Sequence, residues 1–131
     1  MAADRDRPLS PHLQVYRLPL TGITSIAHRI TGVVLSLGAV LVVALLVAAA
    51  AGSQTYQVLY DASAHWLGQL VLFGFTLALY YHLCAGIRHL VWDAGCGYEL
   101  ETARRASWLV IGSAVVLTVI TWVIAVAMNG S

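Results

Sequence analysis

A histidine inside an apolar segment is the residue of this chain best suited to bind a metal. It is His82, the first residue of the segment HLCAGIRHLVWDAG (residues 82–95), and it precedes the Arg88–His89 pair by ~10 Å of helix. Neutral imidazole is the commonest protein ligand of transition metals, and an ionisable group at membrane depth is usually functional. Gly86 would share its helix face and leave room for a flat macrocycle such as haem. The alternative is a histidine that hydrogen-bonds to a neighbouring helix.

A six-coordinate b-type haem needs a second axial ligand, and the sequence offers none at the right depth. The third apolar segment has no histidine, and its only methionine, Met128, is at the far end. His28 is expected at the membrane boundary, level with Arg88 and thus ~10 Å shallower than His82. At that depth His28 is better placed to contact the haem propionates than to bind the iron on the side opposite His82. We therefore expect the other ligand to come from another subunit, which predicts a hetero-oligomer.

Ser25 and Arg29 form a second candidate site, four residues apart at the start of the first apolar segment. A hydroxyl and a guanidinium can both donate a hydrogen bond to a carbonyl oxygen, and a quinone head group carries two carbonyls. The alternative is that Arg29 anchors the helix at the interface and Ser25 caps it. Asp93 could accept from Arg88, although a surface ion pair or a cap explains it as well. His12 and His65 are assigned no role.

Composition places these residues in a membrane protein. Of the 131 residues, 60% are hydrophobic and only 10% are charged, against roughly 25% charged in soluble domains. The chain has room for about three to four spanning helices of ~20 residues, but not for a soluble catalytic domain as well. A net charge of +1 does not suggest nucleic acid as a partner. The two cysteines form neither a disulfide framework nor a Cys-x-x-Cys-His motif for covalent haem attachment.

The elements that must position the site are three transmembrane helices in a single membrane-anchor domain, 1–131. An irregular, proline-punctuated arm is expected over 1–20 and a short polar loop over 52–64. The helices are expected at about 21–51, 65–91 and 106–128. All seven basic residues fall at one side of the resulting bundle, which by the positive-inside rule is cytoplasmic, or the matrix side in an organelle. The N-terminus is then cytoplasmic and the C-terminus periplasmic.

The N-terminal residues indicate which membrane the chain is expected to occupy. Asp4 and Asp6 stand beside Arg5 and Arg7, and no apolar stretch follows that could act as a secretory signal. The segment is also too short and too acidic for a typical mitochondrial transit peptide. We therefore expect a bacterial inner membrane, with the mitochondrial inner membrane as the less favoured alternative.

Two motifs resemble the large, cytochrome b556-type membrane-anchor family of succinate dehydrogenase, respiratory complex II. One is RPLSPHL (7–13) followed by SIAHRITG (25–32), which is similar to the family's S-x-x-H-R-x-[ST]-G pattern. The other is the segment that begins at His82, which matches H-x-x-x-G-x-R-H-x-x-x-D at every fixed position. Together with the three-helix layout, the resemblance covers most of the chain.

The resemblance implies a role for each of these residues. His82 matches the axial ligand of haem b, and the other ligand comes from the second, smaller anchor subunit. Ser25 and Arg29 match the ubiquinone-site residues, and His28 matches a residue near the haem propionates, with Arg29 and His89 close by. A flavoprotein subunit and an iron–sulfur subunit would dock on the cytoplasmic face. Electrons from succinate oxidation would then reach ubiquinone beside Ser25 and Arg29.

Three other functions are weighed against this one. A quinol:fumarate reductase anchor runs the same chemistry in reverse, and sequence does not set the direction because redox potentials depend on the environment. A cofactor-free structural anchor would not need an imidazole at the depth of His82. A small transporter subunit is disfavoured because the third apolar segment offers no polar pathway.

Overall fold

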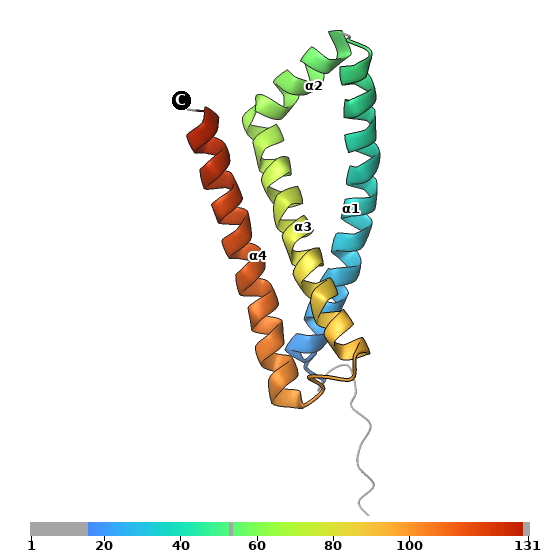
Figure 1. Ribbon diagram of the computed structural model, residues 1–131, viewed down its shortest axis with the longest axis vertical. Coiled ribbons are helices and arrows are strands. Elements are labelled where there is room, and N and C mark those ends of the chain that lie inside the picture. Colours follow the sequence, from blue (N-terminus) through green and yellow to red (C-terminus); the bar gives the residue numbers. More distant parts are fainter. Residues whose placement is uncertain (1–15, 53, 130–131) are drawn as a thin grey trace, which may run out of the picture.

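The part of the chain that the computed structural model describes, residues 16–52 and 54–129, is built from α-helices. These are α1 (Leu20–Ala50), α2 (Gln54–Ala64), α3 (Trp66–Asp93) and α4 (Leu100–Asn129). Figure 1 shows α1, α3 and α4 extending along the long axis of the molecule, with the short α2 joining the far ends of α1 and α3. The N-terminal arm, except for residues 16–19, lies outside the described residues, as does His12.

Three of the helices are long and apolar enough to cross a membrane. They span 31, 28 and 29 residues, at Leu20–Ala50, Trp66–Asp93 and Leu100–Met128. Large apolar side chains are exposed along all three, such as Leu37, Leu70 and Leu109. So much exposed apolar surface is typical of helices that face lipid or other membrane helices. The prediction of an all-α membrane protein with three transmembrane helices is confirmed.

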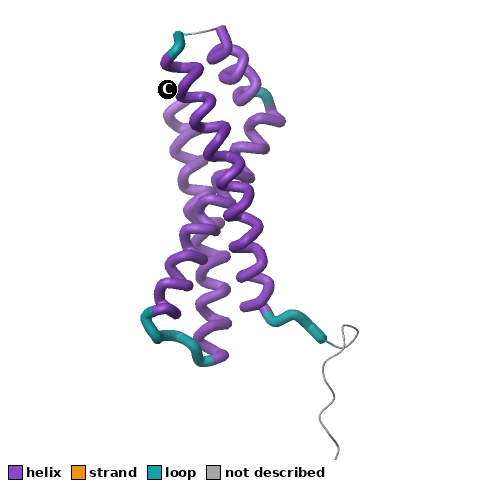
Figure 2. The backbone as a smooth tube through the Cα atoms, turned by 90° about the vertical axis from the view of Figure 1, so that its right-hand side faces the viewer, coloured by secondary structure: helices purple, strands orange, loops and turns teal. Residues whose placement is uncertain are grey.

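Helix α3 is the centre of the bundle and packs against both α1 and α4. Figure 2 shows these long helices running along one common direction, with the non-helical segments gathered at the two ends. Most of the side chains buried between them are small, among them Ala85, Ala103 and Ala114. Without a hydrophobic driving force inside a bilayer, close contact of this kind holds helices together. In Figure 1, α1 and α3 lie close near the start of α1 and spread apart toward α2.

The polar segment expected to be a loop over 52–64 is instead mostly helical, so that prediction was wrong. Gly52, with φ of +61°, separates α1 from α2, and α2 then covers Gln54–Ala64. Its sequence contains neither glycine nor proline, so its polarity does not prevent a helix. His65 follows in an extended conformation, and its Nδ1 accepts a hydrogen bond from the Leu67 N–H at 3.4 Å. His65 therefore caps α3.

The last helix begins at Leu100, earlier than the predicted start near 106. Glu101 lies in its first turn, and the Arg105 Nε donates to the Glu101 carboxylate at 3.0 Å. Helix propensity does not depend on whether a residue is apolar: the polar residues glutamate and arginine favour a helix, as leucine and alanine do. The prediction located only the apolar part of α4, because it relied on where the hydrophobic run begins.

Candidate functional site

His82 lies in the second half of α3, half-buried against α1. Its Nδ1 is 3.1 Å from the backbone oxygen of His28 and 3.2 Å from the Thr31 Oγ1. A Cβ added at Gly32 would be only 3.1 Å from the His82 Cε1, so the ring lies directly over a backbone without a side chain. The alternative considered for His82, a hydrogen bond to a neighbouring helix, is thus realised at one ring nitrogen. The other ring nitrogen, Nε2, has no hydrogen-bond partner among the described residues.

Three histidine rings are stacked where α1 meets α3. The His28 ring stands between the other two, with its centroid 4.2 Å from that of His82 and 4.8 Å from that of His89. The planes are inclined by only 29° and 25°. The predicted depth difference of ~10 Å between His28 and His82 was therefore wrong. It relied on placing His28 level with Arg88, whereas Arg88 contacts Thr24, one turn earlier in α1.

Stacking also determines what the three rings can do together. Two axial ligands must point their nitrogens at one iron from opposite sides, whereas the His28 and His82 rings face each other. Among the described residues, no group of three or more His, Cys, Asp or Glu side chains converges in a way that could hold a metal ion. The Nδ1 of His89 lies 2.8 Å from the Ala85 carbonyl oxygen, and its Nε2 has no hydrogen-bond partner within residues 16–52 and 54–129.

Ser25 and Arg29 lie in the first turns of α1, where the sequence predicted them. Ser25 is half-buried and Arg29 is exposed. Neither side chain hydrogen-bonds to any residue within 16–52 or 54–129, and neither lines the cavity described below. The structure thus places these two donors near each other, at the end of the bundle that also carries the histidine stack.

Arg88 is buried, which the sequence did not predict. It is 5% exposed, and its Nη1 donates to the Thr24 Oγ1 at 2.8 Å and to the Ser107 Oγ at 2.9 Å. Its Nε and Nη2 have no hydrogen-bond partner among the described residues, and its Cζ lies 4.7 Å from the Trp92 ring centroid. The suggested bond from Arg88 to Asp93 is absent, because the guanidinium turns inward while Asp93 is exposed.

Hydroxyl groups connect the buried ends of the three helices, and sequence reasoning missed them. The Tyr81 hydroxyl donates to the Thr24 carbonyl oxygen at 2.8 Å, so Thr24 is held by α3 at both its side chain and its backbone. Ser107 brings α4 into the same network. Polar residues inside otherwise apolar helices were the available signal, because such groups need partners within a membrane.

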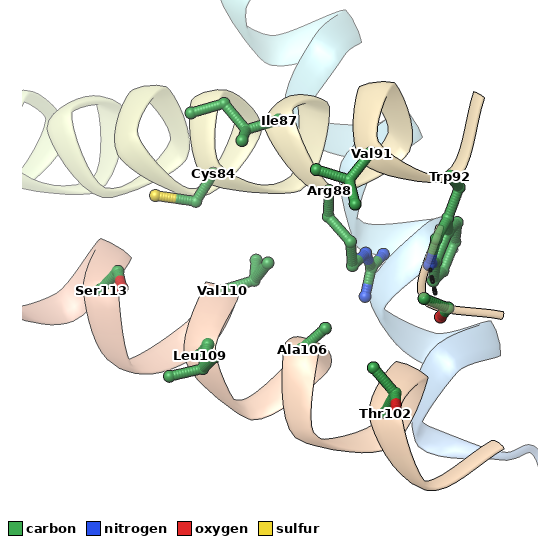
Figure 3. Close-up of a pocket in the computed structure, with 11 residues that line it drawn as sticks. Cys84, Ile87, Arg88, Val91, Trp92, Thr102, Ala106, Leu109, Val110 and Ser113 are labelled. Atoms are coloured by element: carbon green, nitrogen blue, oxygen red, sulfur yellow. Dashed lines mark hydrogen bonds between the residues drawn. The ribbon is translucent and has the colours of Figure 1, made fainter. Parts of the chain in front are cut away.

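A cavity of about 320 Å³ lies beside Arg88, between α3 and α4 (Figure 3). Figure 3 shows the Arg88 guanidinium directed between the two helices, next to Trp92. The cavity is lined by Cys84, Ile87, Arg88, Val91, Trp92, Gly97, Thr102, Ala106, Leu109, Val110 and Ser113. None of the residues predicted to bind haem or quinone is among them, so this cavity is separate from the candidate site.

Comparison with known proteins gives the family. Residues 3–121 match the family described as "Succinate dehydrogenase/Fumarate reductase transmembrane subunit". The "Succinate dehydrogenase cytochrome b556 subunit" of Paracoccus denitrificans is 50% identical over 119 residues, which cover 91% of this chain and 92% of that protein. The "cytochrome b560 subunit" of Reclinomonas americana is 38% identical over 124 residues, covering 91% and 86%. The chain belongs to the succinate dehydrogenase/fumarate reductase transmembrane subunit family.

Membership in this family confirms the prediction that the chain is a succinate dehydrogenase cytochrome b-type membrane anchor. A similar subunit of Rickettsia felis, 35% identical over 117 residues, bears the same b556 description and covers 89% of this chain and 91% of its own. The match includes both motifs, at 25–32 and 82–95, and all of α3. The histidine stack therefore lies within the portion of the chain that the family shares.

Proposed function

We propose that this chain is the haem b-binding membrane anchor of a succinate dehydrogenase and helps to form the site where ubiquinone is reduced. The observation that carries the proposal is His82, an imidazole within a membrane-spanning helix whose Nδ1 is already engaged by α1. The family and the cytochrome names of the relatives support it. Those names also favour succinate oxidation over fumarate reduction as the physiological direction.

The residues around His82 fit a b-type haem. The Nε2 of His82 would bind the iron. Gly86, one turn further along α3, has no side chain, and a Cβ added there would lie 3.9 Å from the His28 Nε2. His28, His89 and Arg29 lie toward the same end of the bundle and would hold the propionates by charge-assisted hydrogen bonds. When bound, the haem supplies one-electron transfer. We assign its other axial ligand to the second, smaller anchor subunit, since His28 faces His82 instead of opposing it.

Ser25 and Arg29 would bind the quinone head group. The serine hydroxyl and the guanidinium can each donate a hydrogen bond to a carbonyl oxygen, and no described residue competes for either donor. Arg29 would also stabilise the negative charge that develops on that oxygen as the quinone is reduced. The apolar surface of α1 next to these residues suits the isoprenoid tail.

The proposed orientation puts the start of α1 on the cytoplasmic side of a bacterial inner membrane and the C-terminus in the periplasm. The α3–α4 connection lies at the same end as the start of α1 (Figure 1), so Arg17, Arg104 and Arg105 gather there. This is the distribution that the positive-inside rule requires. The flavoprotein and iron–sulfur subunits would dock at that end, and the second anchor subunit would cover part of the exposed apolar surface.

The haem assignment is tested in the purified complex by reduced-minus-oxidised spectra. The wild type should show a b-type haem, and His82→Ala should lose it because the iron loses a ligand. His65→Ala is the matched control, since His65 caps α3 far from the stack. An unchanged haem spectrum in assembled His82→Ala complex would refute the assignment. A wild-type complex without haem would instead favour a cofactor-free anchor.

The quinone site is tested by measuring two activities of the same complex. Arg29→Ala should impair ubiquinone reduction while succinate oxidation with an artificial acceptor persists. Arg104→Ala is the control, because Arg104 is an exposed arginine in the first turns of α4. Equal loss of both activities in Arg29→Ala would indicate failed assembly, and retention of both would disprove a role for Arg29.

A further inference from the structure

Thr31 is a fixed position of the first motif for which the proposed function gives no role. It lies in α1, half-buried, one turn beyond His28 and facing α3. Its Oγ1 is 3.2 Å from the Nδ1 of His82, the residue proposed to bind haem iron. The two residues are 51 positions apart in sequence, so this contact exists only because α1 and α3 pack together.

The acceptors around Thr31 and His82 indicate which of these two residues is the donor. The Thr31 Oγ1 lies 2.9 Å from the carbonyl oxygens of both Ala27 and His28, and a hydroxyl has a single proton to give. The His28 carbonyl oxygen, 3.1 Å from the same Nδ1, can only accept, so this neighbour requires a proton on the Nδ1 of His82. The Thr31 hydroxyl can give its own proton to a carbonyl oxygen of α1 and accept from the same Nδ1–H with a lone pair.

We infer that Thr31, together with the backbone carbonyl of His28, holds His82 in the Nδ1–H tautomer and so presents Nε2 as the iron ligand. The inference rests on the proposed haem function and makes Thr31 a positioning residue for it. Gly32 completes the arrangement, because a Cβ there would come within 3.1 Å of the His82 Cε1, a tight contact that the ring avoids by lying over a glycine. A ligating histidine whose other nitrogen is engaged in this way is both oriented and more basic.

The consequences concern haem binding as well as redox properties. Loss of a hydrogen bond that orients a ligating histidine weakens metal binding by roughly tenfold or more. A less basic imidazole also stabilises ferric iron less, so the midpoint potential should become more positive. The His28 carbonyl would still accept from Nδ1, which keeps the expected loss near the lower end of that range.

The experiment compares Thr31→Val and Thr31→Ser in the purified complex. Haem per complex after dilution and the haem midpoint potential from a redox titration are measured for each. Thr31→Val should retain haem roughly tenfold less tightly and shift the potential to more positive values, whereas Thr31→Ser keeps the hydroxyl and should stay near wild type. Thr118→Val is the matched control, because the buried Thr118 hydroxyl donates to the Ala114 carbonyl oxygen of its own helix, away from His82.

Wild-type haem retention and potential in Thr31→Val would overturn the inference. So would a lower yield of complex whose haem keeps the wild-type potential, since a purely structural threonine predicts that result. If Thr31→Val assembles poorly, Thr31→Ala removes the same hydroxyl without adding a methyl group toward the α1 carbonyls. His82→Ala separates the two proposals. Haem that survives His82→Ala refutes the ligand assignment, whereas haem that is lost there but unaffected in Thr31→Val refutes only the role of Thr31.

Discussion

Replacing Gly38 by alanine should loosen the contact between α1 and α3. Gly38 is buried in α1, and a Cβ there would lie 1.9 Å from the Phe75 Cε2 and 2.4 Å from its Cζ. The Phe75 ring would have to move by roughly 1.5 Å to restore an ordinary contact of 3.4 Å. Overpacking of this kind costs about 1–3 kcal/mol. Contacts between helices are the main source of stability inside a membrane, so little else can compensate.

Gly74→Ala is the matched control for this change. Gly74 is in α3, and nothing lies within 4 Å of a Cβ added there. Both substitutions gain the same helix propensity, up to about 1 kcal/mol, so their difference isolates the steric effect. We expect Gly38→Ala to be less stable than Gly74→Ala by about 1–3 kcal/mol, between fivefold and roughly a hundredfold in the folding equilibrium.

The assay is denaturation of the detergent-solubilised complex with rising SDS, with resistance of this chain to proteolysis as the folded signal. A Phe75→Ala background should remove most of the cost of Gly38→Ala, because the clashing ring is gone. The coupling in this double-mutant cycle should equal the steric term. Stabilities of Gly38→Ala and Gly74→Ala that agree within about 0.5 kcal/mol, or a cost that persists without the Phe75 ring, would refute the reasoning.

Two further substitutions test the packing in the same assay. Gly68→Ala should cost more than the change in α1, because its Cβ would come within 2.1 Å of the Ala62 backbone oxygen, which has no side-chain torsion to relieve the clash. Stability equal to that of Gly74→Ala would contradict this. Tyr81→Phe should cost about 0.5–1.5 kcal/mol by removing the 2.8 Å hydrogen bond to the Thr24 carbonyl oxygen, and an unchanged midpoint would show that this bond does not stabilise α1 against α3.

Much of the architecture was predictable because a long apolar run can adopt few structures other than a membrane-spanning helix. A segment of about 20 apolar residues must place its backbone polar groups in a helix to cross a bilayer. The three spans could therefore be located, and His82 could be placed within one of them. The segment over 54–64 was wrongly predicted as a loop because the prediction relied on apolar runs, and α2 is a helix without one.

Charged residues predicted depth in the membrane less well than apolar runs predicted the helices. Arg88 was taken to mark the membrane boundary, yet it is 5% exposed and bonds to Thr24 and Ser107. An arginine at the end of an apolar run can snorkel outward or turn inward, and the sequence of its own helix does not distinguish the two. Because His28 was aligned with Arg88, its predicted depth was wrong as well.

The sequence by itself identified the residues that we propose to carry the chemistry of this protein and the helices that hold them. It determined that His82 lies within a membrane span, and that Ser25 and Arg29 share one face of another. Only the tertiary structure decided the register between α1 and α3, and with it the stacking of His28 on His82 and the contact from Thr31 to Nδ1. Periodicity orders residues along one helix, whereas register between helices depends on how small residues and buried hydroxyl groups fit together.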